Sequence, residues 1–364
     1  MKEVRARGAR NALALLIVGG IAVAACSGGD DSNTAKKAPP TSSTTTTIPI
    51  PTAPFTGLPD PTGVSLTRSS VAVKIENTPE ARPQSGLDVA DVVYEEVVDG
   101  GITRFWAVFN SNAPENIGPV RSVRAMDPQI VTPLGGVVAY SGGTEPNVAA
   151  IRATGLVWVD ENNAGDAFFR EPTRNAPHNL YARSALLWQR GGQPVPPVPL
   201  FGYIDTENDQ AFTGEAVTSF HANYELGYDV SYVWDATVGG WMRFQRTNEP
   251  FLSAAIPAVQ VNATNVIVQF VPYAGFGEGN LIGTGEAWVF SNGQLVRGTW
   301  AKPFIGSITE YKDAAGAPIL LTPGRTWVEL VPIGKTVDLV VPPPPPPPPP
   351  TVAPTTTTTK KRGS

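Results

Sequence analysis

Residues 91–109 have the sequence DVVYEEVVDGGITRFWAVF, in which two apolar runs flank the tripeptide Asp99-Gly100-Gly101. Runs rich in valine and aromatic residues favour β-strands, and the glycines between them permit a tight turn. The pattern predicts a β-hairpin with strands over Asp91–Val98 and Ile102–Phe109. This part of the chain is therefore expected to contain a sheet.

One strand of this hairpin is predicted to carry a charge toward the core. Side chains alternate between the two faces of a strand, so Glu96 shares a face with Tyr94 and Val98. A carboxylate on a largely apolar face requires a partner. Arg104, on the facing strand, and Arg121 are the candidates for that partner.

Outward from the hairpin, strand and helix patterns alternate along the first half of the chain. The predicted elements are strands at Val71–Ile75 and Val137–Tyr140 and helices at Glu145–Thr154 and Leu180–Gln189. The proline-dense stretch Pro194–Pro199 interrupts regular structure and marks a predicted domain boundary. Residues 56–200 are therefore predicted to form an N-terminal α/β-type domain.

After this boundary the patterns are almost all of the strand type. The predicted strands are Asp229–Trp234, Trp241–Arg246, Asn265–Val271 and Glu286–Phe290. The dipeptide Asn292-Gly293 between two apolar pairs predicts a two-residue hairpin turn. Residues 212–340 are therefore predicted to form a mostly antiparallel β domain, and the fold class is predicted to be mixed α+β.

The N-terminal segment predicts export and a lipid anchor. Residues 1–25 combine four basic residues with an uncharged apolar run from Ala12 to Ala25, which is typical of a secretory signal peptide. That run is shorter than the about 20 residues that a membrane-spanning helix needs. Cys26 is the one cysteine of the chain, and Val23-Ala24-Ala25-Cys26 resembles the lipobox of bacterial lipoproteins. By that resemblance the signal peptide is cleaved before Cys26, which then receives a lipid; an incidental cysteine after an ordinary signal peptide is the alternative.

Two flanking segments have the composition of disordered chain. Residues 26–55 are mostly serine, threonine, proline, lysine and glycine, which predicts a disordered tether. Residues 341–364 begin with the proline run Pro342–Pro350 and end in a threonine-rich basic stretch. This composition predicts a disordered tail that includes an extended polyproline II segment. A wall-spanning or solubilising role is favoured for the tail over binding to a proline-recognising partner.

Charge and composition exclude several kinds of site. Cleavage after residue 25 removes four positive charges and Glu3, which changes the net charge from −5 to −8. An acidic, exported chain is a poor candidate for nucleic-acid binding. One cysteine and two histidines, His178 and His221, cannot build a typical zinc site, and no run has the spacing of a calcium-binding loop. We therefore predict no metal and no cofactor.

The run GPVRSVR at residues 118–124 is the first candidate site. Proline is favoured at the first helical position, so a helix is predicted to begin here with Arg121 and Arg124 on one face. Guanidinium groups beside backbone N–H groups would bind phosphate or carboxylate. The candidate ligand-binding residues are Arg82, Arg104, Arg121, Arg124, Arg174 and His178. The alternative is that each arginine pairs with an acidic residue of its own chain.

The run TRNAPHNLY at residues 173–181 is the second candidate. Asn179 is predicted to cap the following helix, which leaves His178 just before it. His178 could act as an acid or base if a nucleophile or carboxyl group were close. Ser141, in the run YSGGT, is one conceivable partner, but this run lacks the spacing of a nucleophile elbow. A structural role for His178 is favoured, and no catalytic triad is visible.

These runs together resemble one protein family. The chain is similar to the YerB-like lipoproteins, whose domain of unknown function has an N-terminal and a C-terminal part, over roughly residues 56–333. The resemblance is carried by TGLP (56–59), ARPQSGL (81–87), ADVVYEE (90–96), GGITRF (100–105), GPVRSVR (118–124), APHNLY (176–181), NVIVQ (265–269), GTW (298–300) and PGRTWVEL (323–330). It implies a two-part architecture and a membrane-anchored location, and it brings no established activity.

We therefore expect a noncatalytic lipoprotein on the extracytoplasmic face of the cell membrane, anchored through Cys26. Its arginine-rich N-terminal domain is expected to bind an anionic envelope ligand, such as a cell-wall polymer fragment, or a protein partner. One alternative is an enzyme that processes such polymers with His178 as acid or base. Another is a scaffold in which the two tails matter most and every arginine is paired within the chain.

Overall fold

The computed structural model describes residues 50–191, 195–208, 210–224 and 227–343. The predicted signal peptide, Cys26, the tether up to residue 49 and the tail from residue 344 onward lie outside these described residues. Within them, no helix has both the length and the apolar character that crossing a membrane requires.

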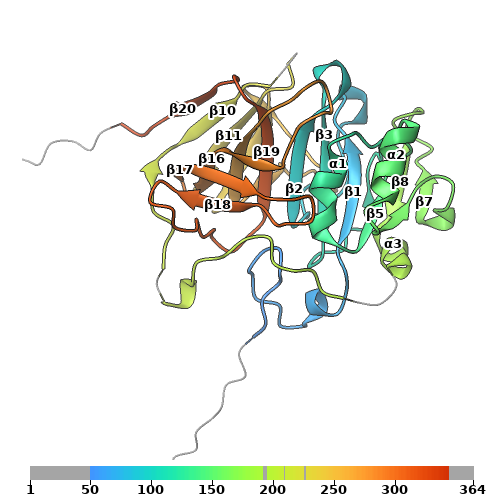
Figure 1. The fold of residues 1–364 in the computed structure, drawn as a ribbon, viewed down its shortest axis with the longest axis horizontal. Coiled ribbons are helices and arrows are strands. Elements are labelled where there is room, and N and C mark those ends of the chain that lie inside the picture. The colour runs from blue at the N-terminus through green and yellow to red at the C-terminus, as the bar shows by residue number, and fades with distance from the viewer. Residues whose placement is uncertain (1–49, 192–194, 209, 225–226, 344–364) are drawn as a thin grey trace, which may run out of the picture. The chain divides into compact units, whose positions relative to one another are not determined.

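The predicted hairpin is confirmed, and it lies within the largest sheet (Figure 1). Strands β2 (Val92–Val97) and β3 (Thr103–Phe109) pair antiparallel, and β1 (Val71–Glu76) pairs antiparallel with the other side of β3. In the described part of the chain this sheet has eleven strands, ten of them in the order β18-β17-β16-β15-β19-β2-β3-β1-β5-β6. The other strands are β5 (Val137–Ala139), β6 (Val157–Val159), β9 (Glu215–Ala216, paired with β17), β15 (Asn265–Val271), β16 (Gly283–Ser291), β17 (Gln294–Lys302), β18 (Glu310–Asp313) and β19 (Thr326–Pro332).

Both halves of the chain contribute to this sheet. β19, from the second half, pairs in parallel with β2, so that Thr326 lies beside Val92 and Glu329 lies beside Glu95. The predicted α/β and β-rich segments therefore share one sheet instead of forming a sheet each. An uncovered strand edge leaves N–H and C=O groups unpaired, so pairing of β19 with β2 provides hydrogen-bond partners for one edge of each segment.

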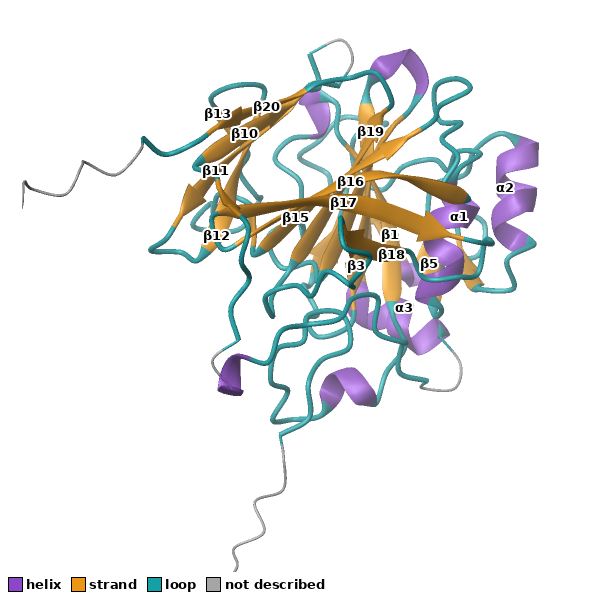
Figure 2. Cartoon of the chain, turned by 60° about the vertical axis from the view of Figure 1, so that its left-hand side comes forward, coloured by secondary structure: helices purple, strands orange, loops and turns teal. Residues whose placement is uncertain are grey.

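A second, antiparallel sheet packs on one face of the first (Figure 2). Its order is β13-β12-β11-β10-β20, with β14 also paired to β12. Phe220 of β10 stacks on Phe290 of β16 with ring centroids 3.8 Å apart, which joins the two sheets at their core. The bounds are β10 (Ser219–Ala222), β11 (Val230–Asp235), β12 (Gly240–Gln245), β13 (Glu249–Pro250), β14 (Asn262–Ala263) and β20 (Val337–Val340).

Helices are short, and the chain is largely β. α2 (Glu145–Arg152) confirms one predicted helix and links the parallel strands β5 and β6, which is an α/β arrangement. The other α-helices are α1 (Asp127–Val131) and α3 (Ser184–Arg190), and a small sheet contains β4 (Asn116–Ile117), β7 (Phe168–Arg170) and β8 (Leu180–Arg183). Short 3-10 turns occur at Val64–Leu66, Pro79–Ala81, Asp99–Gly101, Thr132–Leu134, Gly165–Ala167 and Thr206–Asn208. The prediction of a mixed fold holds in outline, with more strand than helix.

The helix predicted at residues 118–124 is absent, and this prediction was wrong. β5 pairs only with Val71–Val73 of β1, which leaves the edge of β1 open at Lys74–Glu76. Residues 119–121 fill that edge: the N–H of Arg121 donates to the carbonyl of Lys74 at 2.8 Å. Strand-edge pairing therefore outweighs the helical preference of Pro119.

The helix predicted over Leu180–Gln189 is also corrected. Its first four residues form β8, which pairs with β7 and β4, and only Ser184–Arg190 is helical. Asn179 does not cap this helix, because its side-chain amide donates to the carbonyl of Arg174. A sheet edge again decides the conformation where the local pattern fits a helix.

The strands and turn predicted for the second half are confirmed, with boundaries that differ by up to three residues. β15 has the predicted bounds, and Asn292 and Gly293 connect β16 and β17 with φ values of 48° and 69°. Two successive positive φ angles are the geometry that an Asn-Gly hairpin turn requires.

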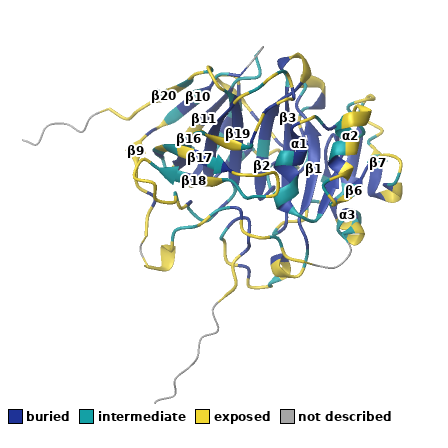
Figure 3. Ribbon diagram, viewed as in Figure 1, coloured by how far each residue is buried: buried dark blue, intermediate teal, exposed yellow. Residues whose placement is uncertain are grey.

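The core lies on both faces of the eleven-stranded sheet (Figure 3). Trp106, Trp241, Trp300 and Trp327 are among the largest fully or nearly fully buried side chains. These tryptophans therefore pack in the interior and do not offer a surface for stacking a ligand.

Candidate functional site

The six candidate residues fall into two groups in space. Arg104, Arg121 and Arg124, here called the arginine cluster, lie at the end of the β1–β3–β2 part of the sheet. Arg104 Nη1 donates to the carbonyl of Ser122 at 2.7 Å, which places its guanidinium beside the segment that carries the other two. Arg82 and Arg174 lie apart from this cluster, and His178 approaches it through Glu76.

Glu76, the last residue of β1, organises one side of the cluster. Its carboxylate is buried and accepts a hydrogen bond from Arg121 Nη2 at 2.9 Å and from the hydroxyl of Thr78 at 2.9 Å. Arg121 Nε forms an ion pair with the second oxygen at 2.8 Å, without the alignment of a hydrogen bond. Burial alone would raise the pKa of Glu76, but Arg121, His178 and Thr78 together lower it below its ordinary value.

Glu76 also orients His178. Nδ1 of His178 lies 3.0 Å from Glu76 Oε2, and because the carboxylate can only accept, Nδ1 carries the hydrogen. No described residue forms a hydrogen bond with Nε2, and the side chain is 21% exposed. A carboxylate that fixes the imidazole tautomer and leaves Nε2 free is the arrangement of a general base.

A nucleophile for such a base is missing from the described residues. The hydroxyl of Thr78 lies on the Nδ1 side, at 3.5 Å. Ser141 makes no hydrogen bond with His178; its backbone N–H donates to the carbonyl of Arg121 at 2.9 Å. Ser141, which the sequence offered as one conceivable partner, therefore does not pair with His178.

Arg104 has the least compensated charge of the cluster. It is 7% exposed, and no carboxylate of the described chain lies within ion-pair distance of its guanidinium. Its Nε is buried and has no hydrogen-bond partner among the residues that the structure describes. Burial, together with the like charges of Arg124 and Arg121, lowers the pKa of Arg104 to about 10.

Arg124 faces outward from the same cluster. Its guanidinium pairs with Asp99, a carboxylate whose side chain is 65% exposed, and its Nη1 donates to the carbonyl of Val123 at 2.8 Å. Its backbone N–H donates to Asp127 Oδ2 at 2.6 Å. Arg124 is therefore held by a partner that solvent also reaches, and its side chain remains 14% exposed.

The predicted partner of Glu96 is corrected. Lys74 of β1, and not Arg104 or Arg121, binds Glu96, and its ammonium also donates to Asp127 Oδ1 at 2.7 Å. The β1 sequence VAVKIE already carries the signal, because Lys74 and Glu76 alternate as charges within an apolar strand. The sequence prediction passed over both residues, and also Asp99.

Arg82 and Arg174 bind the backbone instead of an acidic group. Arg82 Nη2 donates to the carbonyl of Asn77 at 3.0 Å. Arg174 donates to the carbonyls of Ala81 at 2.9 Å and Pro83 at 2.7 Å. These two arginines therefore fasten the loop after β1, and an anion pocket shared by all five arginines is not formed.

Comparison with known proteins gives this geometry a family context. Residues 55–193 match the family described as "Protein of unknown function (DUF3048) N-terminal domain", and residues 220–328 match its C-terminal domain. The chain is 28% identical over 302 residues to "Putative lipoprotein YerB" of Bacillus subtilis (strain 168), which spans 77% of this chain and 86% of that protein. A crystal structure of the YerB protein from Bacillus subtilis superposes with a TM-score of 0.67 at 23% identity, over 79% of this chain and 99% of the other. The chain therefore belongs to the YerB-like family of two-part DUF3048 proteins.

Proposed function

We propose that the protein is a noncatalytic lipoprotein, anchored through Cys26 on the extracytoplasmic face of the membrane, that binds an anionic envelope ligand at its arginine cluster. The anchor is supported by the apolar run that precedes Cys26 and by a relative that is itself named as a lipoprotein. A protein partner with an acidic segment would offer the same chemistry, and the membrane would be reached through the lipid alone.

One observation carries the binding proposal. The guanidinium of Arg104 is buried beside two more arginines, yet it has no carboxylate partner among the described residues. An uncompensated buried charge is costly, and an incoming anion would remove that cost. Glu96, the carboxyl group opposite Arg104 on β2, pairs with Lys74 and forms no ion pair with Arg104.

The partly exposed members of the cluster define how such a ligand is held. Arg121 and Arg124 keep 19% and 14% of their side chains exposed. A phosphate or carboxylate that reaches them would meet planar guanidinium groups suited to bidentate hydrogen bonds. Anionic cell-wall polymers, which present many such groups, are the ligand class that this arrangement favours.

The double variant Arg104→Met/Arg124→Met tests this proposal. Neither substitution uncovers a fully buried carboxylate, since Arg124 pairs with the exposed Asp99 and Arg104 has no ion pair within the described part of the chain. Binding of the full chain to inorganic polyphosphate and to polygalacturonate, measured by isothermal titration calorimetry, should weaken at least about tenfold, as expected for lost charge-assisted hydrogen bonds.

Two control variants make the test specific. Arg170→Met removes the same charge from a surface ion pair with Glu161. Arg174→Met removes an arginine whose hydrogen bonds within the described residues all go to backbone carbonyls. Both should change binding by less than about threefold. Equal weakening by all variants would indicate a general charge effect, and unchanged binding by the double variant would overturn the proposal.

The hydrogen bond between His178 and Glu76 favours one alternative, an enzyme that cleaves wall polymers with His178 as general base. Because no nucleophile adjoins the imidazole, we expect a structural role instead. His178→Ala should lower the free energy of unfolding by about 1–2 kcal/mol through its lost hydrogen bond to Glu76, and should leave polyphosphate and polygalacturonate binding unchanged. Release of fragments from purified wall polymer by the native chain, lost in His178→Ala, would establish the enzyme instead.

A further inference from the structure

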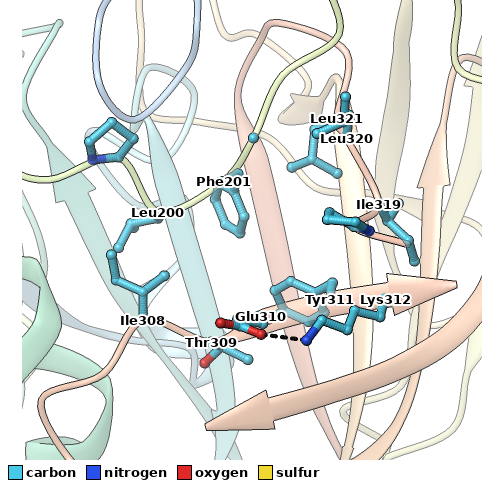
Figure 4. Close-up of a pocket in the computed structure, with 13 residues that line it drawn as sticks. Leu200, Phe201, Ile308, Thr309, Glu310, Tyr311, Lys312, Ile319, Leu320 and Leu321 are labelled. Carbon is cyan, nitrogen blue, oxygen red and sulfur yellow. Dashed lines mark ion pairs between the residues drawn. The ribbon is translucent and has the colours of Figure 1, made fainter. Parts of the chain in front are cut away.

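A hollow lies beside β18, the strand at one edge of the large sheet. It has a volume of about 520 Å³ and lies between the segment 199–202, residues 308–312 and the returning segment 318–321 (Figure 4). Its walls are formed mainly by Leu200, Phe201, Ile308, Tyr311, Ile319 and Leu320. The ion pair of Glu310 with Lys312, at 2.8 Å, is the charged feature drawn at its side. Pockets that bind small molecules have this size and this mostly apolar lining.

A second, narrow hollow adjoins the first, and polar side chains form part of its lining. The two share Leu200, Phe201, Ile308, Thr309 and Tyr311 in their walls, so they meet at these side chains. The narrow hollow has a volume of about 20 Å³, room for one or two water-sized groups. Its remaining lining includes Lys302, Tyr94 and Gln129.

Lys302 is an unusual residue to find at the end of an apolar cavity. It is the last residue of β17 and is 1% exposed. Its ammonium donates to the carbonyl of Ser307, and no carboxylate of the described residues lies within ion-pair distance of it. Burial lowers the pKa of Lys302 to about 8, since no opposite charge of the described chain compensates for the loss of water.

The neighbouring polar groups leave hydrogen-bonding capacity for a ligand. Tyr94 lies on β2, on the same face as Glu96. Its hydroxyl has no hydrogen-bond partner in the described chain. Gln129 uses its side-chain oxygen to accept from the N–H of Leu281 at 2.8 Å, which fixes one wall of the narrow hollow. Lys302 and Tyr94 are therefore the two groups placed to bind an oxygen-bearing head.

We propose that the two hollows together form a binding site for a fatty acid, with the acyl chain along the apolar cavity and the carboxylate at Lys302 and Tyr94. The wide end offers hydrocarbon contacts, and the narrow end offers one unpaired cation and one hydroxyl. A carboxylate has two acceptor oxygens and fits a hollow of this size. A glycerophosphate headgroup is too large for it, so the site selects a single-chain acid over a phospholipid.

The loop beside the cavity is consistent with an amphiphilic ligand. Residues 303–307 join Lys302 to Ile308, and within this loop Phe304 and Ile305 expose 62% and 44% of their surfaces. Two large apolar side chains held in water next to an apolar cavity are the kind of exposed feature that marks a site for an apolar ligand. This proposal does not use the arginine cluster, so it stands or fails independently of the function proposed above.

Calorimetric titration with hexadecanoate and with hexadecanol tests the site. The full-length chain is used with Cys26→Ser, so that no acyl group attached to the protein can enter the cavity. We expect one hexadecanoate to bind per chain, in a saturable manner. Lys302→Met should weaken hexadecanoate binding at least about tenfold, the size of a lost charge-assisted hydrogen bond, and should change hexadecanol binding less than about threefold.

Matched variants distinguish binding of the carboxylate from binding of the acyl chain. Lys312→Met removes a lysine that lines the same cavity but is already paired with Glu310, and should change hexadecanoate binding less than about threefold. Leu320→Glu places a charge in the apolar wall at a side chain that is 39% exposed, so the fold should tolerate it while both ligands bind at least about tenfold more weakly. Non-saturable uptake, or equal hexadecanoate binding by the native chain and Lys302→Met, would overturn the proposal.

Discussion

Replacement of Arg243 by methionine should lower the free energy of unfolding by about 3–5 kcal/mol, the range measured when one partner of a buried ion pair is removed. Arg243 lies on β12 and has no exposed surface, and its Nη2 donates to Glu95 Oε2 at 2.7 Å. Glu95 lies beside Glu329 in the parallel β2–β19 pair. Without the guanidinium, two carboxyl groups would share a dry interior with no cation between them.

The surroundings of Arg243 make this loss large. Its guanidinium carbon lies 4.1 Å from the ring centroid of Phe251 and 4.9 Å from that of Trp327, so aromatic groups surround it and exclude water. Burial and the charge of Glu95 raise the pKa of Glu329 well above its ordinary value, and Arg243 opposes that rise. Protonation of a carboxyl group would remove the buried charge in the variant. The stability loss should therefore be smaller at pH 5 than at pH 8.

Urea unfolding followed by tryptophan fluorescence measures this effect. Arg297→Met is the control, because Arg297 forms an ion pair with Glu215 in which both side chains are close to half exposed. Such surface pairs contribute about 0–1 kcal/mol. Adding Glu95→Gln to Arg243→Met should recover part of the loss. A loss below about 1 kcal/mol in Arg243→Met would contradict the central role assigned to this arginine.

Replacement of Lys74 by methionine should cause the second large loss, again about 3–5 kcal/mol. Lys74 has no exposed surface and its ammonium lies between Glu96 and Asp127, both buried. The indole N–H of Trp106 also donates to Asp127 Oδ1, at 2.8 Å. Without Lys74 the two carboxyl groups would face each other, and the donors to Asp127 would be neutral ones, this indole and the backbone N–H of Arg124.

The pH dependence of the Lys74 variant follows from Glu96. Burial and the charge of Asp127 raise the pKa of Glu96 from its ordinary 4.5 to about 8, while Lys74 lowers it. A carboxyl group with a raised pKa binds its proton more tightly in the folded state, so stability decreases as pH rises from about 4.5 to 8. Loss of Lys74 raises this pKa further. Lys74→Met should therefore lose more stability, relative to the native chain, at pH 8 than at pH 5.

The same unfolding experiment, repeated at pH 5 and pH 8, checks this expectation. Lys312→Met is the matched control, because Lys312 forms a 2.8 Å ion pair with Glu310 on the surface. Its stability should change by less than about 1 kcal/mol at either pH. If the two lysine variants have the same stability, Lys74 does not compensate the buried acids.

The sequence predicted the local elements well because their signals are local. The hairpin of β2 and β3, the helix α2 and the Asn292-Gly293 turn each follow from residues within a few positions of one another. The failures lie where a distant strand edge competes with a local preference. Residues 119–121 extend along β1, and Leu180–Arg183 pairs with β7, although both runs have helical features.

Residue types alone predicted the candidate site incompletely, because the sequence grouped five arginines that have different partners. In the structure Arg121 forms an ion pair with Glu76, and Arg124 forms one with Asp99. Arg82 and Arg174 donate hydrogen bonds to backbone carbonyls. Which arginine meets which acid depends on register between strands and loops. Arg104 lies opposite both Glu76 and Glu96 in the sheet, yet it forms an ion pair with neither.

The sequence by itself determined the hairpin of β2 and β3, the helix α2, the strands β11, β12, β15 and β16, the Asn292-Gly293 turn and the family to which the chain belongs. Only the tertiary structure decided that β19 joins β2 and that Arg243 meets Glu95, a residue 148 positions away. It also decided that Lys302 ends an apolar cavity without an acidic partner. The physical reason is that strand and turn preferences act over a few residues, whereas charge partners are chosen by the register of segments that meet only after the chain has folded.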